Sequence, residues 1–149
     1  MTCARFVRHA AAILALCAST TQPVLAEQWL VISGASHHFR QSERDWRQFN
    51  PGIGFERALE RPGLYAVGGY FRNSYDRHAL YAGVRWMPFE WGPLKLGGYA
   101  LASTGYPSPI LLLPGFSVEG ERLGLNIVLA PNLGRYSGYV GMQVRVRLD

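Results

Sequence analysis

Residues 139–148 read YVGMQVRVRL, and every second side chain of this stretch is apolar. Residues 123–129, LGLNIVL, and residues 80–86, LYAGVRW, alternate in a similar way. Successive side chains of a β-strand point to opposite faces, so a period of two predicts strands with one apolar face. The opposite face carries mainly glycine, asparagine, glutamine and arginine.

Strand-like segments with turn signals between them recur along the chain. We predict strands at residues 29–39, 52–59, 64–72, 79–87, 94–103, 110–119, 123–130 and 139–148. Most of them have the length of a tilted transmembrane strand, about 9–11 residues. No apolar stretch reaches the ~20 residues that a membrane-spanning helix needs.

The first 26 residues have the pattern of a secretory signal peptide. Arg5 and Arg8 form a basic region, an apolar core follows, and residues 24–26 (VLA) form a small-residue cleavage pattern. We therefore predict a mature chain of residues 27–149 that folds as one domain. Both cysteines lie in the leader, so the mature fold is expected to hold without disulfides.

The alternation fits two kinds of β structure. A soluble sandwich or barrel turns its apolar face inward, whereas a membrane barrel turns it toward lipid. Secretion, an even strand count and alternating connection lengths favour the membrane barrel. The short connections are residues 60–63, 89–92 and 120–122, and the longer ones are residues 40–51, 73–78, 104–109 and 131–138. We predict an all-β, eight-stranded antiparallel up-and-down transmembrane β-barrel in the outer membrane of a Gram-negative bacterium, with a soluble barrel as the alternative.

Candidate catalytic side chains fall at one rim of this barrel. If the first strand runs outward, His37 and His38 lie near its outer end, and the loop at residues 72–78 (RNSYDRH) lies at the same end. A histidine within hydrogen-bond reach of the Ser74 hydroxyl could activate it, and Asp76 could orient the imidazole. Polar residues are expected on the surface loops of a barrel, so residue types alone favour a solvated loop over a catalytic site.

A series of short motifs resembles the lipid A palmitoyltransferase (PagP-like) family of eight-stranded outer-membrane barrels. The motifs are PGIGF at residues 51–55, GLYA at 63–66, FRNSY at 71–75, LLP at 112–114 and AP at 130–131. Their order and spacing agree with that family over most of the mature chain. The resemblance implies an enzyme that moves a palmitoyl chain from an outer-leaflet phospholipid to lipid A, using a surface-side histidine, an aspartate and a serine.

The resemblance also assigns roles to individual residues. Ser74 falls on the family's serine, Asn73 on its aspartate, and His38 on its histidine, with His37 as the second choice. Asn73 can orient an imidazole but carries no negative charge to stabilise imidazolium. Asp76 could take over this role if the loop folds back.

The resemblance predicts lateral gaps in the barrel wall at Pro51, Pro114 and Pro131. Proline donates no ladder hydrogen bond, so neighbouring strands can part beside it. These prolines could equally do no more than end strands.

Arg85 stands where the resembling family has a glycine at the floor of its acyl pocket, and alternation also points Arg85 into the lumen. A guanidinium there would shorten the pocket. We expect Glu119, Arg72 and Arg145 to share the lumen and pair with it.

Two functions remain open from the sequence. The first is a lipid-modifying acyltransferase, or a related hydrolase, that accepts a chain shorter than palmitate. The second is a non-catalytic small barrel with an envelope or adhesion role. In both we expect a monomer that contacts phospholipid and lipopolysaccharide and binds no nucleic acid. We expect no cofactor. We also expect no metal site, because His37 and His38 are adjacent in a strand and point to opposite faces.

Overall fold

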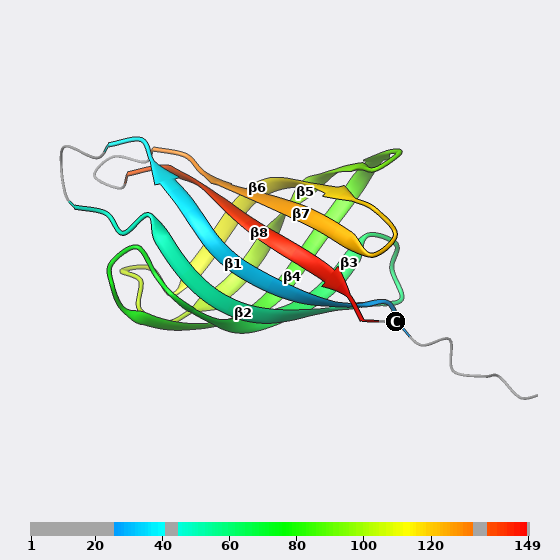
Figure 1. Ribbon diagram of the computed structural model, residues 1–149, viewed down its shortest axis with the longest axis horizontal. Coiled ribbons are helices and arrows are strands. Elements are labelled where there is room, and N and C mark those ends of the chain that lie inside the picture. Colours follow the sequence, from blue (N-terminus) through cyan, green and yellow to red (C-terminus); the bar gives the residue numbers. More distant parts are fainter. Residues whose placement is uncertain (1–25, 41–44, 133–136, 149) are drawn as a thin grey trace, which may run out of the picture.

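The chain forms a closed antiparallel β-barrel, seen from the side in the computed structural model of Figure 1. The structure describes residues 26–40, 45–132 and 137–148. The predicted signal peptide therefore lies outside the described residues, apart from Ala26. No helix within the described part of the chain has the length and apolarity to cross a membrane.

Eight strands follow one another around the barrel in chain order. They are β1 (Gln28–His38), β2 (Phe49–Ala58), β3 (Leu64–Arg72), β4 (His78–Trp91), β5 (Leu94–Ser103), β6 (Ile110–Glu119), β7 (Leu123–Ala130) and β8 (Tyr139–Arg147). Strand β8 pairs with β1 and closes the barrel. The predicted fold class is confirmed. The largest difference is in β4, which continues to Trp91, because the β4–β5 hairpin closes tightly through Gly92 at φ 58°.

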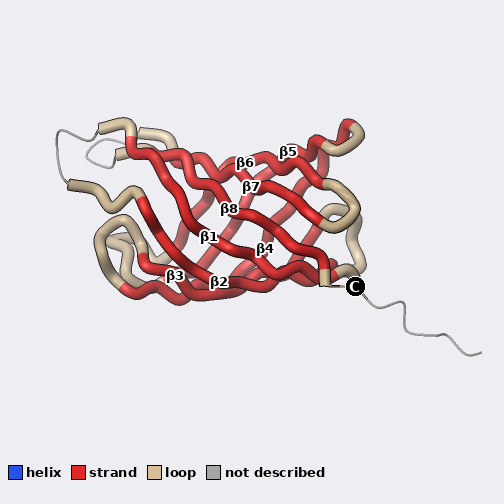
Figure 2. Tube along the Cα trace, viewed as in Figure 1, coloured by secondary structure: helices blue, strands red, loops and turns tan. Residues whose placement is uncertain are grey.

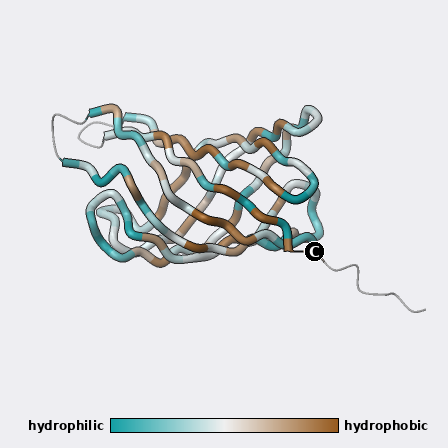
Figure 3. Tube along the Cα trace, in the orientation of Figure 1, coloured by the Kyte–Doolittle hydropathy of each residue, from teal (hydrophilic) through white to brown (hydrophobic). Residues whose placement is uncertain are grey.

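The wall of the barrel is inverted relative to that of a water-soluble protein. Large apolar side chains point outward from every strand and are exposed, among them Ile32, Ile53, Tyr70, Leu80, Leu96, Leu112, Leu125 and Met142. Glu56, Arg85, Asn126 and Arg145 are buried inside. In Figure 3 the hydrophobic colour follows the strands and the hydrophilic colour gathers at the two ends. An apolar outer wall around a polar interior is the arrangement expected of a barrel surrounded by lipid.

The two ends of the barrel differ (Figure 2). The three short turns lie at the end where β1 begins and β8 ends, and the longer loops lie at the opposite end. We call the first the periplasmic end and the second the outer end, following the usual orientation of such barrels. Gly63 in the β2–β3 turn has a φ of 70°, and a Cβ there would lie 2.4 Å from the Met87 carbonyl oxygen. This turn therefore requires glycine.

A buried ion cluster closes the periplasmic half of the lumen. Its members are Glu56, Arg85, Lys95, Glu119 and Arg145. Arg85 lies 3.1 Å from the Glu56 carboxylate and 3.0 Å from that of Glu119. Arg145 also bridges both glutamates, at 2.8 Å from Glu56, and Lys95 lies 3.1 Å from Glu119. The cluster seals this half of the lumen with alternating charges.

Aromatic rings flank the ion cluster. The Arg85 guanidinium lies 4.3 Å from the Tyr65 ring centre, and that of Arg145 lies 4.1 Å from the Trp29 ring centre. The expectation that Arg72 joins this group was wrong. On β3 Tyr65 and Phe71 point inward, so Arg72 faces the other way, and it pairs with Asp76 at the outer rim.

Candidate functional site

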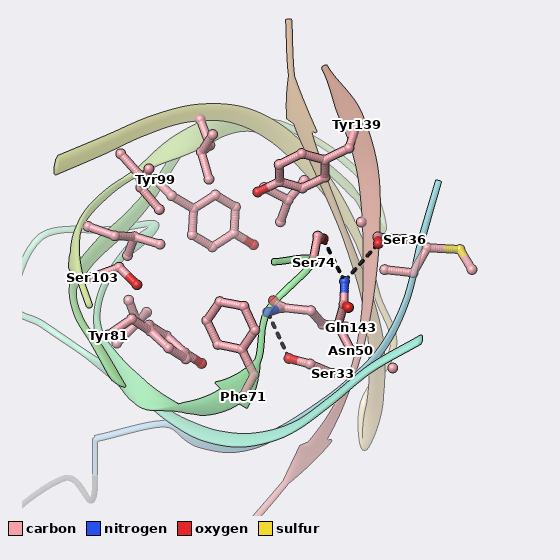
Figure 4. Close-up of a pocket in the computed structure, with 18 of the residues that line it drawn as sticks. Ser33, Ser36, Asn50, Phe71, Ser74, Tyr81, Tyr99, Ser103, Tyr139 and Gln143 are labelled. Carbon is pink, nitrogen blue, oxygen red and sulfur yellow. Dashed lines mark hydrogen bonds between the residues drawn. The ribbon is translucent and has the colours of Figure 1, made fainter. Parts of the chain in front are cut away.

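The outer half of the lumen holds a cavity of about 90 Å³ above the ion cluster, which we call the lumen cavity. Asn50 lies on one side of it and donates from Nδ2 to Ser36 Oγ at 2.7 Å and to Ser74 Oγ at 3.1 Å. Gln143 donates to Ser33 Oγ at 3.1 Å. Figure 4 shows this polar side facing Phe71, Tyr81, Tyr99 and Ser103 across the lumen. The cavity is therefore part polar and part aromatic.

A second cavity, of about 320 Å³, lies in the wall at the outer end, and we call it the wall cavity. The pairing of β6 with β7 begins only at Gly115 and Val128, so residues 110–114 of β6 have no partner in β7. The wall cavity is lined by the inward-facing Leu111 and by Leu112, which is 73% exposed on the outer face. Because residues of both faces line it, this cavity passes through the wall between β6 and β7.

The predicted prolines fall at breaks in the strand pairing. Pro114 directly precedes the first β6–β7 pair, and Pro131 directly follows β7 and lines the wall cavity. Pro51 lies where the β1–β2 register shifts, between the pairs of Ser33 with Gly52 and of Ala35 with Phe49. A missing N–H at each of these positions removes a ladder hydrogen bond.

The structure brings His38 and Ser74 to the same wall cavity. The His38 ring is 3% exposed, stacks on Trp46 at 4.8 Å between ring centres and leans against Tyr139 at 5.3 Å. His38 Nδ1 is buried without a hydrogen-bond partner among the described residues. Ser74 is also buried and lines both cavities. Within the described part of the chain no hydrogen bond joins the two side chains. A bound molecule would have to lie between them to link the Ser74 hydroxyl to the His38 ring.

His37 points to the opposite face of β1 and is exposed, as the alternation of a strand requires. It does not line either cavity. Of the two histidines, His38 is therefore the one that shares a cavity with Ser74.

Asn73 does not orient the imidazole, contrary to the expectation from sequence. Its side chain is fully buried and bonds to the backbone of its own loop and of the β5–β6 loop. Nδ2 donates to the Gly105 carbonyl at 2.9 Å, and Oδ1 accepts from the backbone N–H groups of Tyr75 and Arg77, each at 3.0 Å. Asn73 is thus the residue that shapes the β3–β4 loop.

Asp76 does not replace Asn73 at the histidine either. It sits at the tip of the loop with a φ of 61° and pairs with Arg72 at 2.8 Å and Arg47 at 2.9 Å. The hydrogen bond from Arg72, together with Arg47, holds the pKa of the Asp76 carboxyl below its usual value. Its role in the structure is to tie the β1–β2 and β3–β4 loops together.

Tyr106, in the β5–β6 loop, separates the two cavities and lines both. Its ring contacts Phe71 and Tyr75. Burial raises the pKa of the Tyr106 phenol, so this group stays a neutral hydrogen-bond donor at physiological pH.

Arg85 lies inside the lumen below these cavities. Its partner Glu56 lines the bottom of the lumen cavity, so the ion cluster is the cavity floor. Among the described residues, no group of three His, Cys, Asp or Glu side chains is placed to hold a metal ion.

Comparison with known proteins supports the fold. None of the known family models matches the chain, and no curated protein matches it by sequence. A solution NMR structure of the de novo designed transmembrane β-barrel TMB2.3 is similar, with a TM-score of 0.61, 12% identity, and coverage of 87% of this chain and 99% of that one. At such low identity the likeness concerns the fold alone. A barrel of this membrane type suggests an outer-membrane location, while the resemblance to lipid A palmitoyltransferases stays a prediction.

Sequence reasoning missed Asn50 and Glu56. Glu56 could have been found from alternation, because Gly52, Gly54 and Glu56 share one face of β2, opposite Ile53 and Phe55. Asn50 shares this face, but the predicted strand began only at residue 52, and the contact of Asn50 with Ser74 depends on how the β3–β4 loop folds.

Proposed function

We propose that this protein is an outer-membrane acyltransferase that takes an acyl chain from a phospholipid and passes it to lipid A or a similar hydroxyl-bearing acceptor. The observation that carries the proposal is the meeting of His38 and Ser74 at a cavity that opens through the wall between β6 and β7. A lipid in the outer leaflet could reach a cavity of this kind sideways, without leaving the membrane.

In the proposed reaction the Ser74 hydroxyl oxygen attacks the donor ester carbonyl. The hydroxyl proton passes to His38 Nδ1, which has no partner among the described residues. The acyl–oxygen bond of the donor breaks, and the lysophospholipid leaves with that proton. The acceptor hydroxyl then attacks the acyl-serine carbonyl and gives its proton to His38. The bond between the acyl group and Ser74 Oγ breaks, and Ser74 takes the proton back from His38. Asn50 supports this chemistry, because its amide donates to Ser74 Oγ and leaves the hydroxyl hydrogen free to point elsewhere.

The size of the lumen cavity favours a short acyl chain. Its volume of about 90 Å³ is smaller than the cavity of about 150 Å³ that holds a benzene molecule in a protein core. The ion cluster prevents it from extending deeper. We therefore expect only the first few carbons to enter the lumen, with any longer chain lying in the wall cavity.

The resemblance to lipid A palmitoyltransferases supports the same reading at Ser74, His38 and the prolines beside the wall cavity. The role of Asn73 counts against it, because the acidic residue of that family is replaced here by a side chain that holds its own loop. This replacement favours the second candidate function, a non-catalytic barrel with an envelope or adhesion role.

Mass spectrometry of lipid A and phospholipids tests the proposal, using cells that lack the protein or carry it in wild-type or variant form. Wild-type protein should add one acyl chain to the acceptor. Ser74→Ala and His38→Gln should abolish this gain, and Ser74→Cys should retain part of it because a thiol can still attack. His37→Gln is the matched control and should be active, since His37 faces outward.

Each outcome assigns one function. A Ser74-dependent loss of a chain would indicate a lipid hydrolase. Unchanged lipids, with a barrel that still fractionates with the outer membrane and shifts on unheated gels, would favour the non-catalytic barrel. Recovery of the protein in the soluble periplasm would contradict the membrane location itself.

A further inference from the structure

The lipid-facing wall carries a hollow of about 480 Å³ across β4, β5 and β6. Two rows of cross-strand neighbours define it. In the first row Gly98 pairs with Trp86 on one side and Pro114 on the other. In the second row Ala100 pairs with Val84 and with Leu112. Each row has a small residue in the middle and larger ones on both sides, so the hollow is a trough along β5.

Only part of this trough is explained by the needs of the barrel itself. A Cβ at Gly98 would lie 2.8 Å from the Leu113 carbonyl oxygen, so the close approach of β6 requires glycine there. Ala100 is exposed on the outer face, opposite the exposed Leu112, so a larger side chain than alanine would have room there. The packing of the strands therefore accounts for the small residue at position 98 but not for the one at position 100.

The periplasmic foot of the trough combines an aromatic ring with a positive charge. The Arg61 guanidinium, from the β2–β3 turn, lies 4.7 Å from the centre of the Trp86 ring. Within the described residues Arg61 forms no ion pair. Phe89 and Trp91 stack on each other nearby, and both are 60% exposed. Exposed aromatic rings of this kind mark the level of the lipid headgroups.

We propose that the trough binds one phospholipid of the periplasmic leaflet. One acyl chain lies along Gly98 and Ala100 between the flanking side chains, and the phosphate is paired with Arg61. The apolar lining suits hydrocarbon, and the Arg61 guanidinium, which forms no ion pair among the described residues, suits the phosphate. The trough shares Leu112 and Leu113 with the wall cavity, but neither His38 nor Ser74 lines it, so lipid binding in the trough does not depend on the enzyme activity proposed above.

The energetic reason is packing rather than exclusion of water. A lipid chain gains no hydrophobic energy by moving from other chains onto the wall, because both surroundings are equally apolar. A chain bedded in a trough touches protein on three sides, and a trough left empty would forfeit those dispersion contacts. A chain held in this way exchanges more slowly than the lipids around the rest of the barrel.

Native mass spectrometry of the full mature chain tests the site. The protein is placed in nanodiscs of phosphatidylcholine and phosphatidylglycerol in equal parts and then released into detergent. Wild-type protein should retain one phospholipid, preferentially phosphatidylglycerol. Ala100→Leu fills the trough and should lower the retained fraction clearly below that of wild type. Ala102→Leu, on the same strand and facing lipid beyond the trough, should leave it unchanged.

A second pair of variants tests the foot of the trough without touching its wall. Arg61→Gln should lower retention of phosphatidylglycerol about fivefold, the effect of one basic residue near an anionic lipid, and leave phosphatidylcholine unaffected. Arg57→Gln, another exposed arginine at the periplasmic end, should change neither. Heat-modifiable gel mobility verifies that each variant is folded.

Three results would overturn the proposal. The first is a wild-type barrel that retains no phospholipid. The second is equal retention by Ala100→Leu and Ala102→Leu, which would mean unspecific lipid around the barrel. The third is a dimer in the wild type that is lost in Ala100→Leu, which would make a second copy of the chain the occupant.

Discussion

Replacing Glu56 by glutamine should destabilise the barrel strongly while leaving its shape unchanged. The centre of the ion cluster holds two arginines, Arg85 and Arg145, each bonded to both Glu56 and Glu119. Both arginine side chains are fully buried. Glu56→Gln leaves two buried cations with one carboxylate between them, and an uncompensated buried charge of this kind costs about 3–5 kcal/mol.

The structure also predicts how a second substitution would offset this cost. Glu56→Gln combined with Arg85→Met leaves Glu119 with Arg145 and the partly exposed Lys95, so the cluster returns to the wild-type surplus of one positive charge. The double variant should recover about 2–3 kcal/mol of the loss, which is the coupling expected of side chains in direct contact. Arg85→Met alone should cost less than Glu56→Gln, because Arg145 and Lys95 still neutralise the two glutamates.

The assay is urea unfolding of the barrel in lipid vesicles, followed by tryptophan fluorescence and by heat-modifiable gel mobility. Glu60→Gln in the exposed β2–β3 turn is the matched control and should stay within about 0.5 kcal/mol of wild type. Two results would refute the reasoning: a cost for Glu56→Gln no greater than that of Glu60→Gln, or a double variant as unstable as the sum of the two single ones.

Three further predictions concern the loops and turns. Because the pKa of Asp76 is lowered in the folded protein, its ion pairs stabilise the outer rim at pH values above the ordinary pKa of an aspartate, and this stabilisation is lost as the pH falls through the lowered pKa. Amide hydrogen exchange at residues 73–77 should therefore accelerate in acid. Asp76→Asn should remove this pH dependence. Asn73→Ala should lower the free energy of unfolding by about 1–3 kcal/mol in urea, because it leaves buried backbone groups without hydrogen-bond partners. Asn73→Asp should lose less in the same assay, because it keeps an acceptor for the backbone N–H groups of Tyr75 and Arg77. Gly63→Ala should cost at least about 1 kcal/mol in the same assay, since its φ of 70° and the nearby Met87 carbonyl exclude a Cβ; an unchanged midpoint would mean that the turn can rearrange.

The course of the strands could be predicted from sequence because it depends on a local property, the alternation of side chains along each strand. Alternation also assigns residues to one face or the other, which is why Arg85 was expected in the lumen. The same rule, applied along β3 from Tyr65, would have turned Arg72 outward. The sequence therefore carried the information about Arg72, but the two faces of this strand had not been assigned.

The loops carry no comparable periodicity, so their contacts could not be predicted. Asn73 and Asp76 had the residue types of catalytic side chains. In the structure Asn73 bonds to the backbone of two loops, and Asp76 forms an ion pair that joins the β3–β4 loop to the β1–β2 loop. The contact of Asn50 with Ser74 joins β2 to the β3–β4 loop and depends on how that loop folds.

The sequence by itself determined the period of the strands, their number and the division of each strand into an apolar and a polar face, because these depend only on neighbours in the chain. Which of the two faces points outward is shown by the closed barrel. Tertiary structure places His38, and not His37, at the same cavity as Ser74. It also shows where β6 and β7 part, above Gly115, and it brings the charges of the ion cluster together in the lumen. These features join residues that are far apart in the chain. Their positions depend on the register and curvature with which the strands close the barrel, and single-strand patterns do not carry that information.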